Sequence, residues 1–235
     1  MQTGNKFESH HGTYDDLAPE YYDSGRHPTS ANFREASRKL LFPWFRELIP
    51  PNACILEVGA GCSIVSEWLA EVKWPVARFI ASDLSLKMLS YSGMPGSPVA
   101  SVVCDAQQLP FTANSFDYLV SSLGDPYNTP LFWKEAARVL RIGAYSFFTT
   151  PSFEWAQQFR DGDSHAEFLV SGGHILVPSY IKSLESQRIL IEESGLTFTH
   201  YRDLEEAQLT TTARSPKLRP GPIVSGYVTM KKPGC

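Results

Sequence analysis

The chain has 235 residues and a formal net charge of −4, with 43% hydrophobic and 20% charged residues. The composition is typical of a soluble globular protein, and the length fits one α/β domain better than two. Proteins that bind extended nucleic acid usually carry a basic excess, so the acidic balance argues against that class.

The four cysteines form no C-x-x-C pair and have no histidine at metal-ligand spacing. This usage favours free thiols in a reducing compartment and predicts no metal site. Residues 1–11 contain no apolar core of a signal peptide, and no run of about 18 apolar residues suggests a membrane span. We therefore expect a cytoplasmic protein that does not enter a membrane.

The first elements predicted along the chain are an arm and a long helix. Residues 1–30 are polar, then rich in aromatic and turn residues, and we interpret them as an N-terminal arm or lid. A helix is expected from about Ser30. Its apolar side chains recur at three- and four-residue steps, at Phe33, Ala36, Leu40, Trp44 and Leu48. Pro43 should kink or divide this helix because proline removes a backbone donor.

Strands and helices alternate after this helix. Strands are expected at residues 54–58, 76–82, 99–104, 116–122, 145–150, 196–201 and 223–230. Helices are expected at residues 64–72, 86–91, 129–140 and 179–194. This alternation predicts an α/β fold, a Rossmann-like doubly wound and mostly parallel seven-stranded sheet. The last two strands have no helix between them and predict an antiparallel C-terminal hairpin.

Two local signals refine these boundaries. Ser63 is a plausible N-cap for the helix at 64–72, and Thr129 followed by Pro130 opens the helix at 129–140. Gly143 is expected to end that helix. Residues 31–235 thus form the main domain. It contains an insertion at about 151–178, which is too long for an ordinary strand-to-helix link.

A glycine-rich turn lies between the first strand and the next helix, in the run EVGAG at 57–61. Glycines let the backbone turn tightly and approach a ligand closely, and the amides at a helix start favour an anion. The dinucleotide fingerprint requires a third glycine where this chain has Ile64, which disfavours a pyrophosphate cofactor.

Acidic residues follow the next two strands. Asp83 stands 22 residues after Gly61, at a strand end, where a carboxylate accepts hydrogen bonds from ribose hydroxyls. Asp105 ends the third strand and is placed to accept from an adenine amine. The pattern predicts an adenosine-type site.

Five runs together resemble the class I S-adenosylmethionine-dependent methyltransferase superfamily, in that family's order and spacing. They are ILEVGAG (55–61), ASDLS (81–85), CDAQQLPF (104–111), FDYLVSS (116–122) and EAARVLRIGA (135–144). The resemblance covers roughly residues 52–150. It implies an enzyme that uses S-adenosylmethionine and releases S-adenosylhomocysteine.

The resemblance also assigns roles to residues. It implies that the methionine end of the cofactor lies against Glu57, Gly59, Ala60 and Gly61. It further implies that Asp83 holds the ribose, Leu84 packs on the adenine, Asp105 and Ala106 read the adenine edge, and Ser121 or Ser122 faces the sulfonium. The arm resembles the lid of many members, with Tyr14, Tyr21, Tyr22 and His27 as closing residues.

The acceptor side is less defined. The loop LGDPYN (123–128) resembles, with one proline missing, the Asp-Pro-Pro-Tyr motif of amino methyltransferases, which makes Asp125 a candidate catalytic residue. The alternative is an ordinary turn. Within the insertion, His165 and His174 are candidate general bases because imidazole titrates near neutrality. Each of them has the alternative of an ordinary loop residue.

The function expected is O- or N-methylation of a small-molecule acceptor. One alternative is methylation of a nucleobase or a protein side chain, which the DPY loop and the cluster of Arg214, Lys217 and Arg219 favour and the acidic charge opposes. Another is a non-catalytic protein that binds the cofactor. The sequence does not identify the acceptor, the methylated atom or the oligomeric state.

Overall fold

The computed structural model describes residues 10–11, 13–92, 100–160, 164–171, 173–210 and 213–233. Its main sheet has the order β4-β3-β2-β5-β6-β10-β9, and β10 alone runs antiparallel to its neighbours. The strands are β2 (Cys54–Val58), β3 (Arg78–Asp83), β4 (Ala100–Val103), β5 (Phe116–Ser121), β6 (Leu140–Pro151), β9 (Leu196–Glu205) and β10 (Pro222–Lys231). The expected Rossmann-like α/β fold with an antiparallel C-terminal pair is confirmed.

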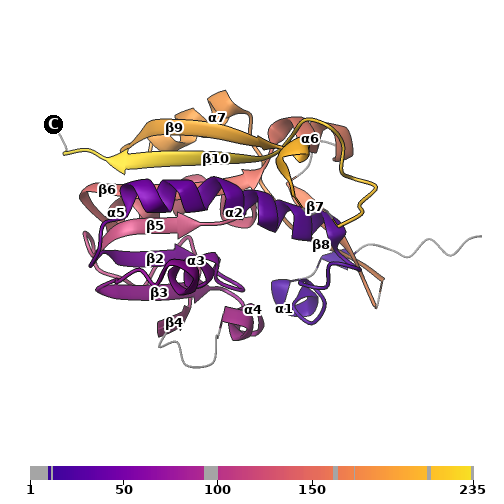
Figure 1. Cartoon of the computed structure of the whole chain (residues 1–235), viewed down its shortest axis with the longest axis horizontal. Coiled ribbons are helices and arrows are strands. Elements are labelled where there is room, and N and C mark those ends of the chain that lie inside the picture. Colours follow the sequence, from indigo (N-terminus) through magenta and orange to yellow (C-terminus); the bar gives the residue numbers. More distant parts are fainter. Residues whose placement is uncertain are drawn as a thin grey trace, which may run out of the picture.

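Helices cover both faces of this sheet (Figure 1). Helices α2 (Pro28–Leu48) and α3 (Ile64–Val72) lie across the near face of the view, and α5 (Pro130–Val139) and α7 (Leu184–Glu192) lie behind. Each pair of helices packs against one face of the sheet and buries a separate apolar core there. Two cores form because both faces of a mostly parallel sheet are hydrophobic. The remaining helices are α1 (Tyr14–Leu17), α4 (Leu86–Leu89) and α6 (Phe153–Phe159), with 3₁₀ turns η1 (Ser90–Ser92), η2 (Asp125–Tyr127) and η3 (Glu206–Gln208).

The sequence suggested that Pro43 would kink or divide the first long helix. The helix is not divided at this residue. Helix α2 is continuous from Pro28 to Leu48, and Pro43 is exposed to solvent on it. Proline donates no amide hydrogen bond at this position, while Phe42 and Phe45 on either side are buried in the core. The packing of these rings holds the helix together across the missing hydrogen bond.

Gly143 does not end a helix. Helix α5 ends at Val139, and β6 begins at the next residue, so Gly143 lies inside the strand with φ of 82°. The register between β5 and β6 shifts between Phe116 and Tyr118, which fits a local irregularity in this stretch of the strand pair. The last helix starts later than expected, at Leu184, because Ser183 caps it by accepting a bond from Ser186 N.

The stretch at 151–178 contains elements that the sequence did not predict. It holds α6 and an antiparallel hairpin of β7 (His165–Val170) and β8 (Gly173–Pro178), and β1 (His10–His11) pairs parallel with β8. Leu17 of α1 packs with Ile175 and Val177 of the hairpin. The arm and the hairpin therefore share a small core at one end of the sheet.

Phe45 provides a test of the α2 and α3 core. Its side chain has no exposed surface, and its ring lies 5.3 Å from both the Trp68 and the Phe147 rings. Phe45→Ala should lower the free energy of unfolding by about 3–5 kcal/mol through lost burial and a cavity. Urea titration measures this loss. Leu131→Ala, at a side chain 57% exposed, is the control and should change stability by no more than about 0.5 kcal/mol. Equal losses in the two variants would contradict this packing.

Candidate functional site

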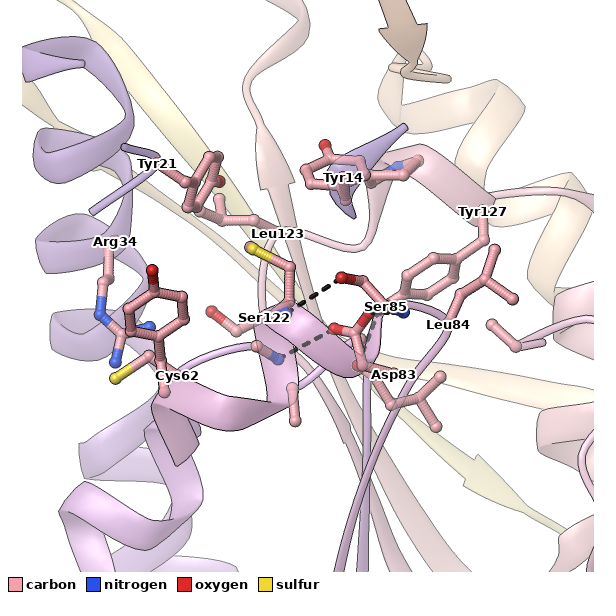
Figure 2. Close-up of a pocket in the computed structure, with 18 of the residues that line it drawn as sticks. Tyr14, Tyr21, Arg34, Cys62, Asp83, Leu84, Ser85, Ser122, Leu123 and Tyr127 are labelled. Atoms are coloured by element: carbon pink, nitrogen blue, oxygen red, sulfur yellow. Dashed lines mark hydrogen bonds between the residues drawn. The ribbon is translucent and has the colours of Figure 1, made fainter. Parts of the chain in front are cut away.

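A cavity of about 960 Å³ opens where β2, β3, β4 and β5 end. The order of strands reverses between β2 and β5, and ligands of doubly wound sheets bind in the crevice at such a point. In Figure 2, Tyr14, Tyr21 and Leu123 lie on one side of the cavity, across from Asp83 and Leu84, and Arg34 and Cys62 lie at one end.

The glycine-rich turn forms the floor of this cavity. Gly59 and Gly61 have φ of 63° and 46°, a conformation that side chains disfavour. A Cβ on Gly59 would overlap Tyr127, and one on Gly61 would overlap the Tyr22 hydroxyl. Ala60, also at the cavity, anchors the turn by donating its amide to Ser82 O at 2.9 Å. Glycine is therefore required here by both backbone conformation and space.

Asp83 stands at the end of β3 beside this turn. Its two carboxylate oxygens each accept one backbone amide at 2.9 Å, Oδ2 from Gly61 and Oδ1 from Ser85. Burial raises the pKa of Asp83, and these two hydrogen bonds act in the opposite direction. A carboxylate has about four lone-pair sites, so acceptor capacity remains for further donors. The next residue, Leu84, lines the cavity with 71% of its surface exposed.

Asp105 and Ala106 line the cavity from the segment after β4. Asp105 Oδ1 accepts the Gln107 amide at 2.8 Å, and Ala106 is buried beside the core. Their position at the neighbouring strand end places them next to Asp83 around one crevice, as expected from the sequence.

Glu57 does not line the cavity. Its carboxylate points to the start of α3, where it accepts bonds from the Ser63 hydroxyl and from the amides of Ile64 at 3.0 Å and Val65 at 3.4 Å. Ser63 also accepts the Ser66 amide, so it is the helix cap that was predicted. Burial raises the pKa of Glu57 to about 7. Glu57 therefore stabilises the glycine-rich turn from the side that faces away from the cavity.

The two serines at the end of β5 differ in position. Ser122 lines the cavity, and its hydroxyl lies 2.7 Å from that of Ser37. Ser121 is fully buried outside the cavity lining, and its hydroxyl lies 2.9 Å from the Tyr127 hydroxyl. The structure thus separates two residues that the sequence left as alternatives.

The arm brings three tyrosines to the cavity, Tyr14, Tyr21 and Tyr22. The Tyr14 and Tyr21 rings meet edge to face with centroids 6.0 Å apart. The Tyr22 hydroxyl accepts the Cys62 amide at 2.6 Å, and so it already satisfies one donor of the turn. His27, also proposed as a closing residue, is buried at the start of α2 and is not part of the lining. Burial raises the pKa of all three tyrosines, which keeps them neutral.

None of the three catalytic candidates lines this cavity. His174 Nδ1 lies 3.3 Å from Glu167 in the β7–β8 hairpin, and His165 Nδ1 lies 3.1 Å from the Ser164 hydroxyl. Asp125 is buried beneath the cavity wall, where it accepts the Ser179 hydroxyl, and burial raises its pKa to about 6.

Sequence reasoning missed two residues that shape the site. Arg34 of α2 lines the cavity, pairs with Glu67 at 2.5 Å and lies 5.8 Å from the centre of the Tyr22 ring. Tyr127 covers Gly59 and donates its hydroxyl to Val58 O at 2.7 Å. The DPY loop signalled Tyr127, but nothing in the sequence separated Arg34 from other polar residues of α2.

Comparison with known proteins gives a family match over part of the chain. A family model described as a methyltransferase domain matches residues 56–148, the segment that carries the turn and both strand-end acids. This match, over less than half of the chain, supports the resemblance to class I S-adenosylmethionine-dependent methyltransferases. This is an enzyme family whose cofactor is S-adenosylmethionine.

The relatives match only part of the chain. A malonyl-[acyl-carrier protein] O-methyltransferase of Herminiimonas arsenicoxydans is 35% identical over 107 residues, which are 44% of this chain and 40% of that protein. The chain thus matches less than half the length of this relative.

Solved structures share the fold at low identity. An S-adenosylmethionine-dependent methyltransferase structure from Listeria monocytogenes has a TM-score of 0.65 at 14% identity, over 86% of this chain and 99% of that one. A Burkholderia thailandensis 1,6-didemethyltoxoflavin-N1-methyltransferase has a TM-score of 0.59 at 14% identity, over 92% and 88%. In the described part of this chain, no helix is long and apolar enough to cross a membrane.

The buried Glu57 predicts a pH effect on stability. Its folded-state pKa of about 7 lies above its ordinary value of 4.5, so the folded protein keeps the proton between these values. The contribution of Glu57 to stability therefore falls as pH rises from about 4.5 to 7. Glu57→Gln removes this dependence. The measurement is the free energy of unfolding in denaturant at pH 5 and pH 8. Between these two pH values, the stability of the variant relative to the wild type should rise by up to about 3 kcal/mol. Parallel pH profiles would contradict this interpretation.

Proposed function

We propose that this chain transfers the methyl group of S-adenosylmethionine to an oxygen or nitrogen atom of a small-molecule acceptor. One observation carries the proposal. The bare turn at Gly59 and Gly61 and the carboxylates of Asp83 and Asp105 surround a single cavity at neighbouring strand ends. The match of the methyltransferase domain to residues 56–148 supports it.

The residues present fit this cofactor. The turn lines the cavity with the bare backbone of Gly59 and Gly61, against which Tyr127 and Tyr22 pack. Asp83 has unused acceptor sites for two ribose hydroxyls, with Leu84 exposed beside it for an adenine ring. Asp105 and Ala106 would contact the adenine edge. Gly61, with Ala60 and Ser122, would line the methionine end, whereas Glu57 would act only by fixing the start of α3.

The chain's own contribution is to position and to exclude water. The bound cofactor supplies an electrophilic methyl group on a sulfonium. Direct displacement at such a methyl group needs alignment above all, and proximity accounts for much of the rate. Tyr14, Tyr21 and Tyr22 of the arm cover the cavity and shield the reacting atoms. The arm at 1–30 would thus be the lid, with its residues 1–9 and 12 outside the described part of the chain.

The elements on the acceptor side of the cavity lie outside the family match. That match ends at residue 148, before the β7–β8 hairpin, and begins after the arm. The name of the malonyl-[acyl-carrier protein] O-methyltransferase relative suggests malonyl-[acyl-carrier protein] as one acceptor. The match to that relative covers only 44% of this chain. Arg214, Lys217 and Arg219, which had favoured a nucleobase or protein acceptor, do not line the cavity. We favour a small molecule for this reason.

We also propose a cytoplasmic location. The described cysteines, Cys54, Cys62 and Cys104, are free, which fits a reducing compartment.

Asp83 tests the cofactor site. Asp83→Asn keeps the shape of the side chain but removes its charge and one acceptor oxygen. Affinity for S-adenosylhomocysteine should fall by about 1.5–3 kcal/mol, or roughly 10- to 150-fold, as charge-assisted bonds are lost. Isothermal titration calorimetry measures this change. Asp117→Asn is the matched control, because Asp117 binds Arg141 and Cys54 N away from the cavity. The affinity of this variant for S-adenosylhomocysteine should equal that of the wild type. An equal Kd for wild type and Asp83→Asn would refute the assignment.

The histidines provide a second test. Since neither His165 nor His174 lines the cavity, His165→Ala and His174→Ala should each keep turnover within about twofold of wild type. The measurement is release of S-adenosylhomocysteine with an acceptor found in a metabolite screen. A loss of more than about tenfold at unchanged cofactor affinity would instead identify a general base in the hairpin.

A further inference from the structure

We infer that the acceptor is an uncharged molecule with a flat, apolar or aromatic body, and that acceptors bearing a free carboxylate or phosphate are excluded. This inference rests on the proposed function, because it concerns the part of the same cavity that the cofactor leaves free. Two observations carry it, the side chains of one wall and the pairing of every cation in the lining.

The wall opposite the strand-end acids is aromatic and apolar. It contains Tyr14, Tyr21 and Leu123 (Figure 2), and the cavity is also lined by Pro126 and Pro178. In Figure 2, the Tyr14 and Tyr21 rings and Leu123 lie across the cavity from Asp83 and Leu84. Flat rings bind well to such a surface through stacking and edge contacts. The cavity of about 960 Å³ lies at the upper end of the roughly 300–1,000 Å³ usual for small-molecule sites, which fits a cofactor with a second small ligand.

The cations in the lining of the described residues are already neutralised. The lining contains two arginines and no lysine or histidine. Arg34 pairs with Glu67 at 2.5 Å, and Arg38 pairs with Glu71 at 2.8 Å and with Glu35 at 3.6 Å. No arginine here is left without a carboxylate partner to receive an anionic acceptor.

Carboxylates outnumber cations around the cavity. Two guanidinium groups face five acids, which leaves a formal net charge of −3; the acids are Asp15, Glu35, Glu67, Asp83 and Asp105. Asp125 lies behind the aromatic wall. The pKa of Tyr21 is raised to about 12, first by the burial of its own ring and next by the negative charge of Asp125. An anionic acceptor would enter a negative field of low dielectric, which is unfavourable.

The charge movement of the reaction agrees with this field. When the lone pair of a neutral acceptor forms the new bond to carbon, the electron pair of the broken bond stays on sulfur, and one positive charge passes from sulfur to the acceptor atom. That atom then loses its proton to water. The positive charge stays beside the same carboxylates until the proton leaves, so the cavity stabilises it throughout.

The test compares two probes that differ in charge and share one ring system. 2-Naphthol is neutral and 2-naphthoate is anionic at pH 7.0. Each is titrated by calorimetry, in low salt, into protein saturated with S-adenosylhomocysteine. We expect 2-naphthol to bind at least tenfold more tightly than 2-naphthoate. Equal or tighter binding of 2-naphthoate would overturn the inference, and so would a failure of both probes to bind.

Two variants with opposite charge changes show whether the discrimination is electrostatic. Glu35→Gln removes a negative charge from the lining. It should lower the ratio of the Kd for 2-naphthoate to the Kd for 2-naphthol by about threefold. Arg38→Gln removes a positive charge and should widen it by a similar factor. Asp117→Asn, outside the cavity, should leave the ratio unchanged. Identical ratios in all three variants would contradict the role assigned to the charges.

The same titrations separate this inference from the proposed function. Failure of wild-type protein to bind S-adenosylhomocysteine would overturn the proposed function, and the inference with it. Normal binding of S-adenosylhomocysteine together with a preference for 2-naphthoate would overturn only the inference about the acceptor.

Discussion

The buried carboxylate of Glu57 fixes the geometry on which the site depends. It accepts the Ser63 hydroxyl and the first amides of α3, so the helix start is satisfied from inside the protein. The free amides at a helix N-terminus often bind a ligand, but here a side chain of the chain itself accepts them. The turn at Gly59 and Gly61 is therefore held between β2 and α3, with Tyr127 and Tyr22 packed against its two glycines.

The acids that face the cavity are placed by sheet topology. Parallel strands bring their carboxyl ends to one edge, so Asp83 at the end of β3 and Asp105 after β4 become neighbours although they are 22 positions apart in the sequence. The amides that Asp83 binds also tie β3 to the glycine-rich turn and to α4. One carboxylate thus serves both the fold and the proposed cofactor site.

The cover of the cavity is built from two distant parts of the sequence. Leu17 of the arm shares a core with Ile175 and Val177 of the hairpin, and Glu20 accepts the Ser171 amide at 2.8 Å. Tyr22 then reaches the turn through the Cys62 amide. Because these contacts link the arm, the hairpin and the turn, access to the cavity depends on all three.

The amino-acid pattern alone was enough to predict the sheet, most helix boundaries and the strand-end positions of Gly59, Gly61, Asp83 and Asp105. These follow from local patterns: apolar periodicity, caps such as Ser63, and glycine at positive φ. The folded arrangement was needed to show that Glu57 and Ser121 lie outside the cavity lining and that Arg34 and Tyr127 are part of it. It also places His165 and His174 outside that lining. The hairpin of β7 and β8 and the continuity of α2 through Pro43 were decided in the same way. Side-chain direction at a site depends on packing between segments far apart in the chain, and no local pattern encodes those contacts.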